Sequence, residues 1–122
     1  MKKKTIAILG STGSIGQSVL DVVKKSNEFK VELLIANKNY LKITKQINVF
    51  KPSIVIINNK NVFLKIKKQY INKNIVVLND IVNIKKYIKK IDVTVSAIPG
   101  IAGLEPTILF TKISKKILLA KK

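Results

Sequence analysis

The chain has 122 residues, 47% of them hydrophobic and 25% charged, which is typical of one globular domain and excludes a disordered protein. It has no cysteine and no histidine, which excludes a disulfide framework and a thiolate metal site and removes the commonest general base. No apolar run is long enough to span a bilayer or to form a signal peptide, so we expect a cytoplasmic protein without membrane contact.

The net charge is +18, and all 24 basic residues are lysine. Arginine, the usual residue for bidentate contacts to phosphate and bases, is absent, and the lysines are scattered through every segment. Lysine, isoleucine and asparagine are all in excess, and an A/T-rich genome explains this because their codons are A/T-rich. We therefore expect no specific nucleic-acid partner. A basic nucleic-acid-binding protein is kept as an alternative.

The first predicted elements are a buried strand at 5–9, a glycine turn and a helix. Gly10, Gly13 and Gly16 follow the strand at three-residue spacing, a relative of the dinucleotide-binding fingerprint. The face of the helix is formed by Ile15, Val19, Val22 and Val23. Such a turn presents backbone N–H groups at the positive end of a helix, where a phosphate binds. A plain tight strand-to-helix turn is the alternative.

The middle of the chain predicts strands at 29–36, 53–57 and 75–78, with a helix in each gap. The first of these helices ends at Pro52. The two apolar faces are formed by Tyr40, Ile43, Ile47 and Phe50, and by Val62, Phe63, Ile66 and Tyr70.

The last third of the chain continues the alternation. Asn79 is predicted to cap a fourth helix. The apolar face of that helix is formed by Ile81, Ile84, Ile88 and Ile91. A strand at 93–96, a loop of small residues at 97–103, a helix with Pro106 in its first turn and a strand at 117–120 follow.

This alternation predicts a single domain, residues 1–122, with a Rossmann-like, doubly wound α/β fold and a mostly parallel sheet. Ligands in such folds bind at the carboxyl ends of the strands. Three segments fall there, at 10–15, 37–39 and 96–103. NAD-selective domains carry an acidic residue at the second of these segments, but here Lys38 stands there and favours NADPH. A solvated lysine is the alternative interpretation.

At this point the sequence resembles the 1-deoxy-D-xylulose 5-phosphate reductoisomerase family. The motifs that carry the resemblance are the turn at 10–16 with Leu20-Asp21-Val22-Val23 behind it, the segment 37–39, the signature 96–107 and the strand 117–120. They occur in the family's order and spacing. The resemblance implies an enzyme of non-mevalonate isoprenoid biosynthesis that rearranges and reduces 1-deoxy-D-xylulose 5-phosphate to 2-C-methyl-D-erythritol 4-phosphate. It also implies NADPH, a divalent metal (Mg, Mn or Co) and a homodimer in the full-length protein.

The resemblance also implies site residues. Thr12, Gly13, Ser14 and Ile15 would contact the pyrophosphate and nearby ribose of NADPH. Asn37, Lys38 and Asn39 would surround the 2′-phosphate, and Ala97 and Ile98 would line the path of the cofactor. Lys121 falls on a cofactor-binding asparagine of the family, and Lys122 falls on its substrate-binding lysine.

Two departures limit what this chain is expected to do by itself. Lys121 replaces the family's asparagine, and the glutamate that would follow Lys122 is absent. No carboxylate cluster for a metal is present, so neither metal ligands nor catalytic residues are assigned within 1–122. We expect those groups and the dimer contacts beyond Lys122, and no turnover from the isolated chain.

Three other interpretations remain. A different Rossmann reductase, such as a semialdehyde dehydrogenase, would need a nucleophilic cysteine, and this chain has none. A non-functional gene fragment and the nucleic-acid-binding protein are the other two. The family also allows a plastid location in place of the bacterial cytoplasm.

Overall fold

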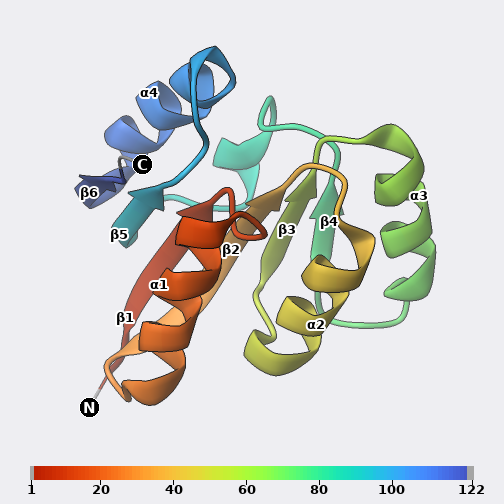
Figure 1. The fold of residues 1–122 in the computed structure, drawn as a ribbon, viewed down its shortest axis with the longest axis horizontal. Helices are drawn as coiled ribbons and strands as arrows, with labels where there is room; N and C mark the ends of the chain where they lie inside the picture. The colour runs from red at the N-terminus through yellow and green to blue at the C-terminus, as the bar shows by residue number, and fades with distance from the viewer. Residues whose placement is uncertain (1, 121–122) are drawn as a thin grey trace.

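The structure, a computed structural model, describes residues 2–120 as one parallel sheet with helices on both faces (Figure 1). The expected Rossmann-like α/β fold is confirmed. The elements are β1 (Lys4–Leu9), α1 (Ser14–Lys25), β2 (Phe29–Ala36), α2 (Tyr40–Phe50), β3 (Ile54–Ile57), α3 (Lys60–Gln69), β4 (Val76–Leu78), the 3-10 turn η1 (Ile84–Lys86), β5 (Ile91–Ser96), the 3-10 turn η2 (Ile101–Gly103), α4 (Leu104–Ile113) and β6 (Ser114–Leu119).

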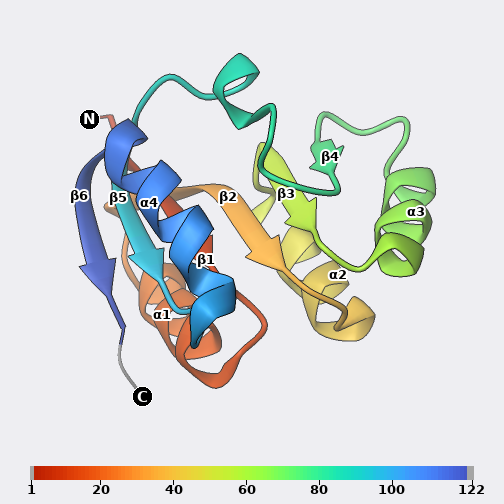
Figure 2. The same cartoon turned by 90° about the horizontal axis from the view of Figure 1, so that it is seen from above.

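The six strands of this region lie in the order β4-β3-β2-β1-β5-β6, and every neighbouring pair is parallel. Figure 2 shows them fanning from β6 to β4. The chain builds outward from β1 to β4 and then crosses back to place β5 on the other side of β1. The loops after β1 and β5 therefore leave the sheet toward opposite faces. This reversal is the topological switch point where doubly wound folds bind ligands.

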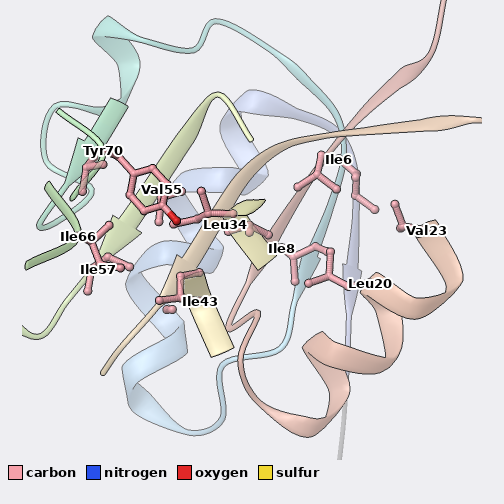
Figure 3. Close-up of a cluster of buried hydrophobic side chains, with 14 of the residues drawn as sticks. Ile6, Ile8, Leu20, Val23, Leu34, Ile43, Val55, Ile57, Ile66 and Tyr70 are labelled. Carbon is pink, nitrogen blue, oxygen red and sulfur yellow. The ribbon is translucent and has the colours of Figure 1, made fainter. Parts of the chain in front are cut away.

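Two hydrophobic clusters cover the two faces of the sheet. Helices α1, α2 and α3 pack on one face, where the cluster includes Leu20, Ile43 and Ile66 (Figure 3). The turn η1 and helix α4 pack on the other face through Ile84 and Phe110. Strand β3 is buried along its whole length, which is why its sequence is apolar without alternation.

The pairing of β1 with β2 contains a β-bulge at Glu32. Ile6 pairs with Val31, whereas the next residue, Ala7, pairs with Leu33. The extra residue turns Val31 and Leu33 to opposite faces, although two positions separate them. The remainder of β2 therefore keeps apolar side chains in both clusters.

The predicted helix capped by Asn79 is wrong. The Asn79 side chain donates to the Ile57 carbonyl at 2.8 Å, and the Asp80 carboxylate instead accepts from the Val82 N–H at 3.1 Å. This Asx turn competes with helix formation. Ile84 and Ile88 are both buried, but the only helical turn here is the 3-10 turn Ile84–Lys86, and Ile88 lies after it. The fourth isoleucine of the proposed face, Ile91, begins β5.

Other boundaries differ by a few residues. Strand β6 begins at Ser114, directly after α4, so no loop separates the two elements. Pro106 lies in the first turn of α4, as expected. None of the helices within residues 2–120 is long and apolar enough to cross a membrane.

Candidate nucleotide-binding site

The glycine turn after β1 requires glycine at two positions for reasons internal to the protein. Gly10 has φ +87°, and a Cβ there would lie 2.9 Å from the carbonyl oxygen of Ala97. A Cβ on Gly16 would lie 2.2 Å from the carbonyl oxygen of Gly10. These close approaches place the start of α1 directly against the end of β1.

Gly13 is different, because nothing in the protein demands a glycine there. Its φ is −74°, and an added Cβ would meet only the Gly10 carbonyl oxygen, at an ordinary 3.7 Å. Gly13 is the N-cap of α1, and no side chain within residues 2–120 caps this helix. The first N–H groups of α1 are thus left without a side-chain acceptor, as an anion-binding helix terminus requires.

The turn opens into a cleft of about 720 Å³ at the carboxyl edge of the sheet. Five of the predicted site residues line it: Thr12, Gly13, Asn37, Ala97 and Ile98. They come from the loops after β1, β2 and β5, so the structure brings together segments that the sequence separates by up to 86 positions, from Thr12 to Ile98.

The other predicted residues lie beside the cleft. Ser14 and Ile15 border a shallow groove along α1. Lys38 and Asn39 are exposed, and the Asn39 side chain caps α2 by accepting from the Lys42 N–H at 3.1 Å. Lys121 and Lys122 lie outside the described residues.

Sequence reasoning missed several lining residues. Asn58 follows β3 at the same edge of the sheet as Asn37, so its position was the available signal. Asp80 was hidden by the wrong helix prediction, and nothing in the sequence marked Glu105. Two of the six acidic residues thus line the cleft, whereas no lysine within residues 2–120 does so.

Backbone and amide hydrogen bonds fix the loops around the cleft. The Asn59 N–H donates to the Asn37 carbonyl at 3.0 Å, and the Asn59 side chain caps α3. The Asn79 side chain reaches the carbonyls of Ile57 and Asn58. The loops after β2, β3 and β4 therefore form one connected rim.

The opposite wall is the loop after β5. Gly103 lets this loop fold back tightly, since a Cβ there would lie 2.3 Å from the Ile98 carbonyl oxygen. The hydroxyls of Ser96 and Thr107 lie 2.6 Å apart and connect the end of β5 to α4. Ala97 and Ile98 are thereby held between a strand end and a helix.

The acidic residues of the chain do not gather into a metal site. Within residues 2–120, no group of three or more aspartate, glutamate, histidine or cysteine side chains lies together to hold a metal ion. The described residues therefore do not fit the divalent metal that the family resemblance implies.

The parallel sheet, the switch point and the glycine turn at an uncapped helix define a Rossmann-like domain of the nucleotide-binding type. Residues 6–122 match the sequence profile of 1-deoxy-D-xylulose 5-phosphate reductoisomerase. The chain belongs to this family.

Relatives and solved structures agree with this assignment. The reductoisomerase of Pelagibacter ubique is 42% identical over 98% of this chain, and that of Francisella tularensis subsp. tularensis is 38% identical over 99%. The chain spans 32% and 31% of those two proteins.

A solved reductoisomerase in complex with NADPH, fosmidomycin and magnesium has a TM-score of 0.85 and 26% identity, covering 97% of this chain and 30% of that one. The enzyme of Zymomonas mobilis in complex with NADPH has a TM-score of 0.86 and 24% identity over 98% of this chain and 32% of that one, a likeness of fold.

Proposed function

We propose that this chain is the NADPH-binding domain of a 1-deoxy-D-xylulose 5-phosphate reductoisomerase. The observation that carries the proposal is the uncapped start of α1 at Gly13, which opens into the large cleft at the switch point. A helix terminus of this kind stabilises a phosphate through its free N–H groups and its dipole. The family's solved complex with NADPH supports the choice of cofactor.

The pyrophosphate is assigned to the turn formed by Thr12, Gly13, Ser14 and Ile15. Thr12 and Gly13 line the cleft, whereas Ser14 and Ile15 begin α1 and contribute through the backbone. The space beside Gly13 fits a close approach of the cofactor, because an added Cβ would meet no protein atom closer than 3.7 Å.

The 2′-phosphate is assigned to Asn37, Lys38 and Asn39, directly after β2. Asn37 lines the cleft. Lys38 is the next residue and is exposed, and its ammonium group would neutralise a phosphate bound beside Asn37. Ala97 and Ile98 would border the nicotinamide end and keep water from it. When bound, NADPH would supply a hydride, and Ala97 and Ile98 would orient the cofactor.

The whole protein is proposed to convert 1-deoxy-D-xylulose 5-phosphate to 2-C-methyl-D-erythritol 4-phosphate with a divalent metal. The ligands of that metal would have to come from outside residues 2–120, because no acidic cluster within this region can hold it. The single domain 1–122, the homodimer, the cytoplasmic location and the roles of Lys121 and Lys122 stay predictions.

Calorimetric titration of the whole protein with NADPH tests the proposal, with Gly13→Ala as the informative variant. The fold itself has room for the added methyl group. A phosphate bound close to the turn would occupy the same space and would clash with that methyl group. We expect Gly13→Ala to weaken NADPH binding at least about tenfold with a melting temperature within about 3 °C of wild type. Wild-type protein that does not bind NADPH would overturn the proposal, and RNA binding at physiological salt would then support the nucleic-acid alternative.

A further inference from the structure

One buried amide connects the glycine turn to helix α2. Gln46 lies on α2 and is 8% exposed, and its Nε2 donates to the Ser11 carbonyl oxygen at 2.9 Å. Ser11 is fully buried at the start of the glycine turn. The bond joins residues 35 positions apart.

Ser11 is held from two directions. Its N–H donates to the Ile35 carbonyl at 3.0 Å, and the neighbouring N–H of Gly10 donates to the same carbonyl at 2.8 Å. These bonds fix the turn to β2, while Gln46 fixes it to α2. The position of the turn relative to α2 therefore depends on the Gln46 side chain.

Helix α2 also begins at the segment assigned to the 2′-phosphate. Asn39 is its N-cap, and Gln46 lies two turns further along the same helix. A shift of the turn against α2 would thus change the separation between the turn and residues 37–39.

The polar groups around this bond are only partly paired. Ser11 Oγ and Gln46 Oε1 are buried without a hydrogen-bond partner among residues 2–120. These two unpaired atoms destabilise the fold, whereas the bond itself gives the buried Ser11 carbonyl a partner that an apolar side chain at position 46 could not supply. The amide nevertheless occupies a place on α2 from which it reaches the turn.

We propose that Gln46 is a positioning residue, which sets the separation of the glycine turn and the 37–39 segment to match that of the pyrophosphate and 2′-phosphate of one NADPH. This inference rests on the proposed function. Gln46 does not line the cleft, so its effect passes through Ser11.

Gln46→Met provides the first test, in the whole protein, with two ligands. NADPH reaches both segments, whereas adenosine 2′-monophosphate reaches only residues 37–39. We expect the variant to bind NADPH about tenfold more weakly, the effect of one ordinary buried hydrogen bond, and to bind adenosine 2′-monophosphate as wild type does. Equal losses for the two ligands, or no loss for either, would overturn the inference.

Gln46→Glu provides a second test through pH. The ionised carboxylate cannot donate to the Ser11 carbonyl, whereas the protonated acid can. NADPH affinity should therefore fall about tenfold at pH 9 and recover toward pH 5.5, relative to Gln69→Glu. Gln69 lies exposed on α3 and accepts from the Tyr40 hydroxyl, so its variant carries the same charge change without the bond to the turn. Comparison with Gln69→Glu also corrects for titration of the 2′-phosphate of NADPH itself.

A failure of the proposed function can be distinguished from a failure of the role proposed for Gln46. If wild-type protein does not bind NADPH, the proposed function fails. If wild type binds and Gln46→Glu follows Gln69→Glu at every pH, only the role of Gln46 fails.

Discussion

Thr5 and Asp92 hold each other by reciprocal hydrogen bonds although 87 positions separate them. The Thr5 N–H donates to the Asp92 carboxylate at 2.8 Å, and the Asp92 N–H donates to the Thr5 hydroxyl at 3.0 Å. The pair joins the beginnings of β1 and β5, the two neighbouring strands whose following loops line the cleft at the other end. The register of β1 against β5 is thus fixed at the edge of the sheet opposite the site.

This pair predicts an acid-dependent stability. The Thr5 N–H lowers the pKa of Asp92, and Lys115, 3.2 Å away, lowers it further. A carboxyl with a depressed folded pKa stabilises the fold above its unfolded pKa of about 3.9, and this contribution is lost as pH falls through the folded value. Asp92→Asn should therefore reduce the acid sensitivity of urea unfolding between pH 6 and pH 2. The control is Asp21→Asn, on the exposed side of α1. If the free energy of unfolding falls equally with acid in both variants, the assignment is contradicted.

The Gly16 contact predicts a severe loss of stability. An added Cβ would lie 2.2 Å from the Gly10 carbonyl oxygen, so α1 must move away from β1. We expect Gly16→Ala to destabilise the protein by about 2–3 kcal/mol, as overpacking does, and to weaken NADPH binding with it. Denaturant unfolding measures the first effect. Gly13→Ala is the matched control, since its methyl group fits the fold, and equal destabilisation of both variants would argue against the contact.

Most of the fold follows from local sequence signals. Apolar runs such as Ile54–Ile57 are readable because both faces of a parallel strand are buried. Alternation and right-handed crossovers then predict a parallel sheet with helices on both faces, but not the order of its strands. The bulge at Glu32 is not readable, because it depends on the pairing of β2 with β1 rather than on either strand alone.

The site was predicted in part for the same reason. Glycine spacing marks the turn at Gly13, and strand ends mark Asn37 and Ala97, which all line the cleft. Asp80 was missed because four isoleucines at helical spacing are a stronger sequence signal than one Asx turn. Gln46 was missed because a polar residue on α2 gives no sign in the sequence that it points inward at the turn.

The Thr94 and Ser114 hydroxyls predict a non-additive pair of substitutions. They lie 2.6 Å apart, and both residues are buried between β5 and β6. Thr94→Val leaves the Ser114 hydroxyl without its partner and should cost about 1–3 kcal/mol. Adding Ser114→Ala removes the orphaned group, so the double variant should be no less stable than Thr94→Val. A double-mutant cycle by urea unfolding measures this, and additive losses would show that the hydroxyls do not interact.

Lys38 predicts a choice between cofactors. It follows β2 at the segment assigned to the 2′-phosphate, and it is exposed, so solvent and salt weaken its charge interaction. We expect Lys38→Ala to weaken NADPH binding about three- to tenfold and to leave NADH binding unchanged, because NADH lacks the 2′-phosphate. Calorimetry with both cofactors at low and physiological salt measures the difference, which should shrink as salt rises. Lys45→Ala, exposed on α2, removes the same charge from the surface and controls for the general field of a chain with net charge +18. If both variants weaken NADPH equally, or if Lys38→Ala weakens NADH as much as NADPH, the lysine acts through net charge and the 2′-phosphate is bound elsewhere.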